Sequence, residues 1–169
     1  MDIQAIVYTS NTGYTAECAQ LLGKKLGLRV FSLDEARVSL AKDTKIIYLG
    51  WLMGGLVKGY NKAKKRFVVR AVCGVGMGAP GSQIADIRKI NAIPENVPAF
   101  SLRGGFDMRK LRGIYKFMMT FMVLHFEKTL GEKPDRDPDE EAIVDMVRNG
   151  ASYVREADLA PVIKWYKNR

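Results

Sequence analysis

Residues 3–15 read IQAIVYTSNTGYT, an apolar run that passes directly into a loop of hydroxyl and amide side chains. The run 3–9 is typical of a buried strand, and a helical pattern over 16–26 follows the loop at once. Hydroxyls, backbone N–H groups and a helix N-terminus that meet after a strand form a ready site for an anion, and Gly13 permits the tight turn. Helix N-caps also require Ser, Thr or Asn, so the loop alone leaves both interpretations open.

Strand-like and helix-like segments alternate along the rest of the chain. Further short runs rich in Val, Ile, Tyr or Phe occupy residues 30–33, 45–50, 67–73 and 97–102. Helical patterns between them cover residues 34–41, 56–65 and 83–91. This alternation predicts βαβ units and a mostly parallel sheet. We therefore expect an α/β fold, a five-stranded three-layer α/β/α sandwich that forms a single domain over residues 1–169.

Composition narrows the class of protein. The chain has 169 residues, 47% of them hydrophobic and 27% charged, which suits one globular domain and excludes a disordered, collagenous or disulfide-built protein. Cys18 and Cys73 are too few for a disulfide framework or a metal-ligand cluster. The first residues lack the basic and long apolar regions of a secretory signal, so a cytoplasmic protein is expected.

The loop after the first strand resembles the first loop of flavodoxins, Ser/Thr-x-Thr-Gly-x-Thr, which holds the phosphate of FMN. The matching residues here are Ser10, Asn11, Thr12, Gly13, Tyr14 and Thr15. Tyr14 is an unusual occupant of its position. The resemblance implies a flavodoxin-like sheet of order 2-1-3-4-5, with FMN bound at the carboxyl ends of the strands.

The resemblance also assigns two loops to the isoalloxazine ring of FMN. The first follows the third strand and contains Trp51, Leu52, Met53 and Gly54. Trp51 is expected to stack on the ring, although an ordinary core tryptophan would give the same pattern. The second follows the fifth strand and contains Arg103, Gly104, Gly105 and Phe106. Its paired glycines permit close approach of the backbone to the ring, and the charge of Arg103 is expected to make the FMN potential less negative than in acidic carriers. A glycine-rich run after the fourth strand, residues 74–78, has the same permissive character but also fits a simple turn.

Residues 108–130 read MRKLRGIYKFMMTFMVLHFEKTL and are too long and too apolar for a loop. A helix lying on a sheet needs an apolar stripe about 100° wide, and on an ideal helix this segment has far more. A second apolar surface is therefore expected to meet it. The candidates are the protein's own core, a homodimer partner, a lipophilic substrate, or an anionic membrane at whose inner face the protein would lie peripherally. Its apolar part, 117–126, which only Thr120 interrupts, is about half of the ~20 residues that a bilayer span requires.

Positive charge is concentrated in the middle of the sequence. The whole chain carries +9, and residues 58–116 hold thirteen Lys or Arg and three Asp or Glu, a net charge of +10. Such a segment attracts anionic partners. Its densest cluster also fits a solvated helix face and consists of Lys58, Lys62, Lys64, Lys65 and Arg66. Nucleic acid is not an expected partner, because no recognised reader motif accompanies the charge.

The basic charge and the segment 108–130 distinguish the chain from ordinary flavodoxins, and both resemble the branch that includes menaquinone-dependent protoporphyrinogen oxidase. The matching runs are 102–106 and 115–119. The resemblance implies an FMN-dependent oxidoreductase that passes electrons to a quinone, a porphyrin-like substrate or a redox partner protein, with the flavin carrying the chemistry and no catalytic side chain or metal. A soluble electron carrier and a flavin-free binding module are the alternatives.

Overall fold

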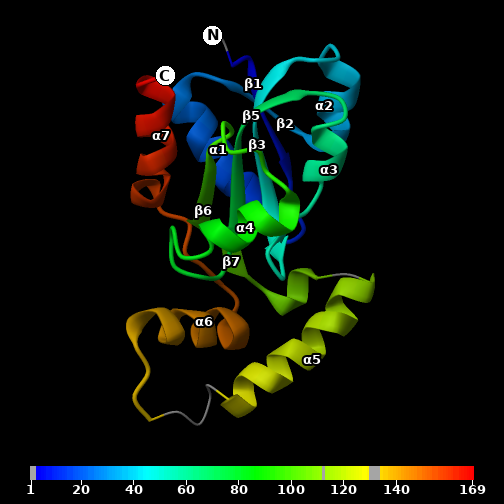
Figure 1. The fold of residues 1–169 in the computed structure, drawn as a ribbon. Helices are drawn as coiled ribbons and strands as arrows, with labels where there is room; N and C mark the ends of the chain where they lie inside the picture. Colours follow the sequence, from blue (N-terminus) through cyan, green and yellow to red (C-terminus); the bar gives the residue numbers. More distant parts are fainter. Residues whose placement is uncertain (1–2, 112, 130–133) are drawn as a thin grey trace.

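The computed structural model describes residues 3–111, 113–129 and 134–169. Its centre is a mostly parallel sheet of order β2-β1-β3-β5-β6 (Figure 1). The strands of that path are β1 (Ala5–Thr9), β2 (Arg29–Ser32), β3 (Lys45–Met53), β5 (Val68–Gly76) and β6 (Ala99–Arg103). Neighbouring strands on the path are all parallel, and the short β4 (Leu56–Val57) pairs antiparallel with β3. Counted along the chain, the parallel strands have the predicted order.

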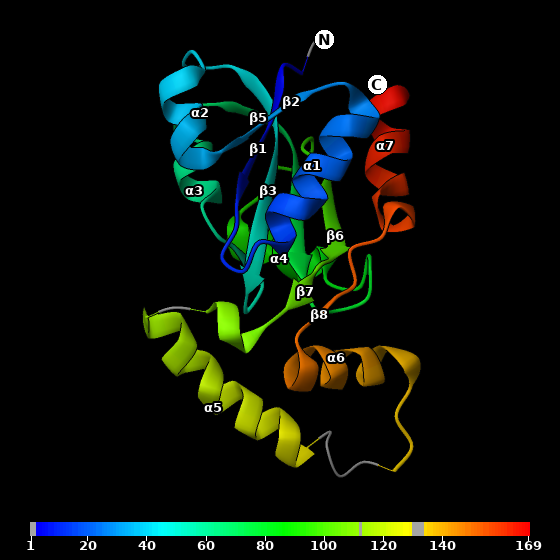
Figure 2. The ribbon, with the colours of Figure 1, turned by 180° about the vertical axis from the view of Figure 1, so that it is seen from behind.

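Helices cover both faces of the sheet, as Figures 1 and 2 show from opposite sides. One face packs against α1 (Tyr14–Leu26), the turn Glu156–Leu159 and α7 (Ala160–Lys167). The other packs against α2 (Leu33–Ser39), α3 (Tyr60–Ala63) and α4 (Ile84–Asn91). Each face has its own apolar cluster, with Leu22 and Val162 fully buried on the first and Ile87 on the second. The arrangement is compatible with a three-layer α/β/α sandwich.

The hairpin between β3 and β4 corrects two expectations from the sequence. The predicted strand 45–50 continues to Met53, so Trp51, Leu52 and Met53 lie on β3 rather than in a loop. Gly54 and Gly55 then turn the chain with φ of 56° and 81°. Positive φ at both residues of a two-residue connection is the geometry of a type I′ hairpin. This turn replaces the first part of the helix predicted over 56–65 with β4, leaving only the short α3.

The elements between β6 and the turn Glu156–Leu159 form a separate layer at the carboxyl ends of the strands (Figures 1 and 2). They are β7 (Gly105–Phe106), the 3-10 turn Met108–Lys110, α5 (Gly113–Thr129), α6 (Pro138–Asn149) and β8 (Ala151–Ser152). β7 and β8 pair antiparallel. A third apolar cluster holds this carboxyl-end layer together, with Phe106, Leu111 and Met146 buried in it.

A single helix was expected over 108–130, and this expectation is wrong: the segment begins with a 3-10 turn, and α5 comes after it. The carboxylate of Asp107 accepts hydrogen bonds from the backbone N–H of Arg109 at 2.9 Å and from its guanidinium, which closes a 3-10 turn. Leu111 follows in extended conformation and is buried, and α5 begins only at Gly113. Leu130, the last residue of the predicted segment, lies outside the described residues.

One face of α5 is exposed and apolar. The helix packs into the third cluster through Tyr115, Met119 and Val123. The exposed fractions on the other side are 68% for Ile114, 65% for Phe117, 61% for Phe121 and 57% for Leu124. Within the described chain no second apolar surface covers these four residues, which we call the exposed α5 face. Over the same part of the chain, no helix is both long and apolar enough to cross a membrane.

Acid is expected to loosen the carboxyl-end layer through Asp107. The hydrogen bond from the Arg109 guanidinium, together with its charge, lowers the pKa of the Asp107 carboxyl in the folded state. The resulting stabilisation is complete above the ordinary pKa of aspartate and is lost as the pH falls through the lowered folded-state pKa. Melting temperatures of the wild-type protein should therefore fall more steeply on the acid side than those of Asp107→Asn. Equal decreases in the melting temperatures of the two proteins as the pH is lowered would contradict this.

Candidate functional site

A cavity of about 360 Å³ lies where the carboxyl ends of the central strands meet the carboxyl-end layer. The loop after β1 contributes Asn11, Thr12, Tyr14 and Thr15, and the β3 end and hairpin turn contribute Trp51, Leu52, Met53, Gly54 and Gly55. The end of β5 and the loop between β5 and α4 contribute Val75, Gly76, Met77, Gly78 and Gln83. The carboxyl-end layer adds Gly105, Phe106, Leu111, Tyr115, Met118, Met119 and Ile143. The volume falls in the range of about 300–1,000 Å³ that is usual for small-molecule sites.

The loop at the start of α1 presents polar groups to this cavity. The N-cap of α1 is Gly13, at φ 96°, which has no side chain to accept a helical N–H. The hydroxyl of Ser10 accepts a hydrogen bond from the Gly13 N–H at 3.1 Å. Thr12 and Thr15 thus do not serve as the N-cap; both line the cavity beside first-turn N–H groups, which helix geometry leaves without intrahelical partners. The combination of hydroxyls and the positive end of a helix suits an anion.

Asn11 carries an unsatisfied donor at the same place. Its side-chain nitrogen Nδ2 is buried and has no hydrogen-bond partner. A buried donor without a partner costs about 1–3 kcal/mol. Since Asn11 lines the cavity, a ligand with acceptor oxygens bound there would remove this cost.

Aromatic rings form one wall of the cavity. The ring of Trp51 meets that of Tyr115, on α5, edge-on with centroids 5.2 Å apart and an interplanar angle of 88°. The ammonium of Lys58 lies 5.7 Å from the Trp51 centroid and 5.5 Å from that of Tyr115. Trp51 is therefore not an ordinary core tryptophan, because it is only partly buried and borders the cavity. Tyr115 was assigned no ligand contact from the sequence.

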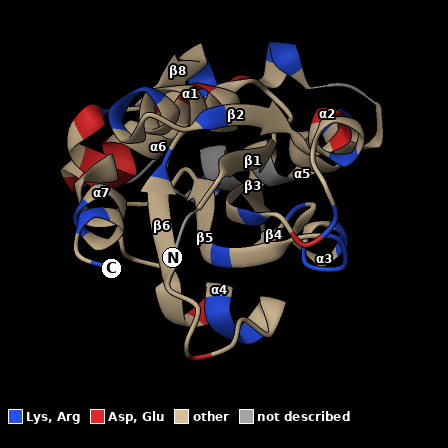
Figure 3. Ribbon diagram, turned by 90° about the horizontal axis from the view of Figure 1, so that it is seen from above, with Lys and Arg blue, Asp and Glu red and all other residues tan. Residues whose placement is uncertain are grey.

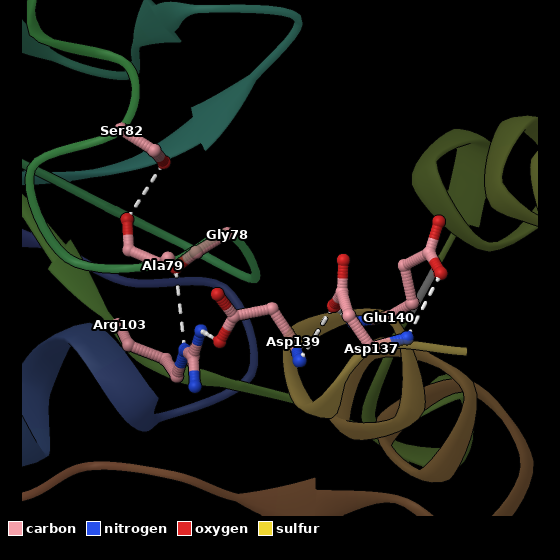
Figure 4. Close-up of polar contacts among 7 residues, drawn as sticks. All are labelled: Gly78, Ala79, Ser82, Arg103, Asp137, Asp139 and Glu140. Atoms are coloured by element: carbon pink, nitrogen blue, oxygen red, sulfur yellow. Dashed lines mark hydrogen bonds and ion pairs between the residues drawn. The ribbon is translucent and has the colours of Figure 1, made fainter. Parts of the chain in front are cut away.

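Arg103 does not line this cavity. Its guanidinium pairs with the carboxylate of Asp139 on α6 and donates from Nε to the carbonyl oxygen of Gly78 at 3.4 Å (Figure 4). The side chain is only 11% exposed. Arg103 thus ties the loop after β5 to α6, and both elements contribute to the cavity wall. Among the described residues, the lining holds no charged side chain.

The paired glycines after β6 are required by protein packing. A Cβ at Gly105 would lie 2.5 Å from the carbonyl oxygen of Ala151 on β8, and one at Gly104 would lie 2.7 Å from a methyl of Val75. The N–H of Gly104 donates to the carbonyl of Gly76 at 2.8 Å. The close approach inferred from these glycines is therefore made by β8 and β5. Gly105 and Phe106 still border the cavity, whereas Gly104 does not.

Several cavity residues were not foreseen from the sequence. Met77 and Gly78, which follow β5, line the cavity together with Gly105 and Phe106 of the expected second ring loop. Met118, Met119 and Ile143 come from α5 and α6. The predicted strand 67–73 continues to Gly76, so of the glycine-rich run 74–78 only Met77 and Gly78 follow β5. The signal for this loop was present, because glycines permit close approach at the end of a parallel strand. The helix residues gave no comparable signal, since their position depends on how the carboxyl-end layer folds back.

A second cavity, of about 450 Å³, lies beside the first, and Asn11, Trp51 and Tyr115 line both. Its other lining residues are Thr9, Ser10, Leu33, Asp34, Leu56, Val57, Lys58, Gly59, Asn61 and Lys62. Ser10, assigned to the phosphate loop from the sequence, borders this second cavity rather than the first. Gly13 borders neither.

The two cysteines are buried and do not line either cavity. Burial raises the pKa of the Cys18 thiol to about 12 and also raises the pKa of Cys73. Thiols with raised pKa stay protonated near neutral pH and are poor nucleophiles. Thiol chemistry is therefore not part of the site.

The candidate site is thus an uncharged, largely apolar cavity with a polar end built from the β1–α1 loop. Within the described ranges, no group of His, Cys, Asp and Glu side chains could hold a metal ion. Comparison with known proteins shows no matching family model and no matching curated protein.

Proposed function

We propose that the protein is an FMN-binding oxidoreductase of flavodoxin-like fold. The observation that carries the proposal is the cavity at the carboxyl ends of the strands, polar at the β1–α1 loop and apolar elsewhere. Its position agrees with the rule that open α/β sheets bind ligands beyond the carboxyl ends, where the strand order reverses. Here β1 and β3 are neighbours in the sheet with their crossover helices on opposite faces.

The residues at the polar end suit the phosphate of FMN. Thr12 and Thr15 offer hydroxyl donors, the first turn of α1 offers N–H groups, and Asn11 offers its unpaired Nδ2. Phosphate bound at a helix N-terminus needs no cation, because the unpaired N–H groups carry partial positive charge. The absence of charged side chains from the described lining is therefore consistent with this proposal.

Apolar residues would hold the ring system and exclude water. Trp51 lies on β3 and Met77 follows the end of the neighbouring β5, and the carboxyl-end layer adds Leu111, Tyr115 and Met119. When bound, FMN supplies one- and two-electron transfer, while the protein supplies orientation and electrostatics. Because Arg103 is paired with Asp139, its charge is not expected to shift the flavin potential by direct contact.

The apolar side chains that α5 contributes to the cavity wall suggest the kind of electron-transfer partner. Methionine and aromatic side chains form an adaptable apolar surface, and Met118, Met119 and Tyr115 present such a surface at the cavity. It suits a lipophilic quinone or porphyrin-like substrate, in keeping with the resemblance to the menaquinone-dependent protoporphyrinogen oxidase branch. A soluble electron carrier would instead exchange electrons only with another protein.

Anaerobic mixing separates these possibilities. The FMN-loaded protein is mixed with excess menadiol, a small quinol, and in a second experiment with protoporphyrinogen IX, and the visible flavin absorbance is followed. Loss of absorbance with either compound, faster than with free FMN, supports the oxidoreductase. A protein that binds FMN but is reduced only by a protein donor would be a carrier. A protein that retains no FMN would be a flavin-free binding module.

We also propose that the exposed α5 face lies on an anionic membrane surface. Phe117 and Phe121 contact each other edge-on on this face and are both mostly exposed. The exposed side chains of Lys110, Lys116 and Lys128 are on or next to the same helix. An apolar helix face flanked by lysines is the pattern of an interfacial helix that also attracts anionic headgroups.

Vesicle sedimentation tests this membrane proposal. The protein should pellet with vesicles of anionic phospholipid at low salt, and less at high salt because the charges are screened. Since burying a phenylalanine contributes about 1.5–3 kcal/mol, Phe117→Ser with Phe121→Ser should weaken binding by about 100-fold or more. Val38→Ser, which alters an exposed apolar residue on α2, is the control and should bind normally. No pelleting at low salt, or a stable dimer that protects Phe117, would contradict the proposal.

A further inference from the structure

The second cavity combines apolar walls with cationic side chains. Leu33, Leu56, Val57 and the rings of Trp51 and Tyr115 supply the apolar part. Ser10, Asn61, Lys58 and Lys62 supply hydrogen-bond donors. Asp34 is the one acidic residue in the described lining. This composition differs from that of the first cavity, whose described lining is uncharged, and it suits a different kind of ligand.

Lys58 is held in place by the fold around it. The hydroxyl of Tyr48 donates to the Lys58 carbonyl oxygen at 2.8 Å and lies 2.7 Å from the hydroxyl oxygen of Thr9, a hydrogen-bond distance. The Lys58 N–H donates to the carbonyl oxygen of Trp51 at 3.1 Å. The side chain extends over Trp51 and Tyr115, which places its ammonium beside the shared aromatic wall. A cation positioned in advance loses less conformational entropy when it binds an anion.

The two lysines have no acidic partner among the residues that the structure describes. No ion pair is found for Lys58, Lys62 or Asp34 within the described part of the chain. Lys64, Lys65 and Arg66 follow α3 in the sequence, and Figure 3 shows Lys and Arg gathered at α3 beside the sheet. The local excess of positive charge therefore favours an anion in the cavity over a neutral molecule.

We propose that the second cavity binds a small amphipathic anion, an apolar or aromatic group that carries a carboxylate or a phosphate. Lys58 and Lys62 bind the anionic group, assisted by the amide of Asn61, and the apolar part lies against Val57 and the Trp51–Tyr115 wall. The site goes beyond the proposed function, because its residues act whether or not FMN is bound. The wall that it shares with the first cavity places such a ligand next to the proposed flavin site.

Calorimetric titration with small probes tests the site directly. Phenyl phosphate and phenylacetate represent the two anion types on the same apolar group, inorganic phosphate lacks the apolar group, and benzyl alcohol lacks the charge. Phenyl phosphate or phenylacetate should bind at least about tenfold more tightly than inorganic phosphate, and benzyl alcohol should not bind measurably. The better of the two anions identifies the headgroup. Absence of binding by both would overturn the proposal.

Lysine variants with a matched control locate the binding. Lys58→Met and Lys62→Met should each weaken the better probe by about tenfold, because each removes a charge-assisted contact. Lys65→Met removes the same charge from an exposed lysine outside the cavity and should leave affinity within about twofold. Because Lys62 is exposed, its variant should fold normally even if Lys58→Met is perturbed. Equal weakening by all three variants would show only general attraction to a basic surface and overturn the site.

A titration after FMN addition separates this site from the proposed flavin site. Binding of the probe that is unchanged in the FMN-loaded protein supports a distinct second cavity. Loss of probe binding on FMN addition would mean that the probe occupies the flavin phosphate position, which overturns the inference while supporting FMN binding. If the protein takes up no FMN, the lysine variants of the apoprotein still decide the inference.

Discussion

Replacing Thr12 and Thr15 together by valine is expected to weaken FMN binding by a factor of about 10²–10⁴. Both residues line the polar end of the first cavity, and neither serves as the N-cap of α1. A hydrogen bond to a charged group contributes about 1.5–3 kcal/mol, and two are removed. Valine has nearly the shape of threonine, so the buried Thr15 position should still pack. Titration of flavin fluorescence against the two proteins measures the change.

The matched control is Thr120→Val on α5. Its hydroxyl donates to the carbonyl of Lys116 at 2.9 Å and does not border the cavity. This variant makes the same chemical change and should bind FMN as the wild type does. Wild-type affinity in the Thr12 and Thr15 double variant, with FMN still bound, would show that the phosphate lies elsewhere.

Gly59→Ala is expected to lower the free energy of unfolding by about 2–5 kcal/mol. Gly59 has φ 84°, where a residue with a Cβ is strained by about 1–2 kcal/mol. Its Cβ would also collide with the hydroxyls of Tyr48 and Thr9, and overpacking of this kind costs about 1–3 kcal/mol more. Displacing Tyr48 would break its hydrogen bond to Lys58. Denaturant unfolding followed by circular dichroism measures the loss.

Gly81→Ala separates the two contributions. Gly81 has φ 82°, nearly the same as Gly59, but a Cβ there would meet nothing within 4 Å. Its replacement should cost only the backbone strain, about 1–2 kcal/mol. Equal losses for the two variants would mean that the Tyr48 hydroxyl moves aside freely and that the turn before α3 is not tightly packed.

The parallel core of the fold was predictable because its signals are local. Buried strands in α/β proteins are short runs of β-branched residues, and the helices between them have their own periodicity. The β3–β4 hairpin was not predicted, although Gly54-Gly55 is a hairpin signal. Residues 56–65 also fit a helical pattern, so the sequence was compatible with either a hairpin or a helix. In the structure the turn at Gly54-Gly55 and the pairing of Leu52 with Val57 give the hairpin.

Cavity residues were predictable from the sequence where they lie at or just after the carboxyl end of a parallel strand. Asn11, Thr12 and Thr15 follow β1 and Trp51 lies near the end of β3. The fold brings all four to one cavity. Arg103 also ends a strand, but its environment depends on Asp139, which comes from a distant helix. Contacts made by the carboxyl-end layer, such as that of Tyr115 with Trp51, depend on tertiary packing that no local pattern encodes.

The visible absorption spectrum of the purified protein tests the central claim most directly. It is recorded as isolated, and again after FMN is added and the excess removed by desalting. The proposal predicts the two absorption bands of oxidised flavin, in near-stoichiometric amount after addition. A folded protein that stays colourless after FMN addition would contradict it, and the first cavity would then serve a different ligand.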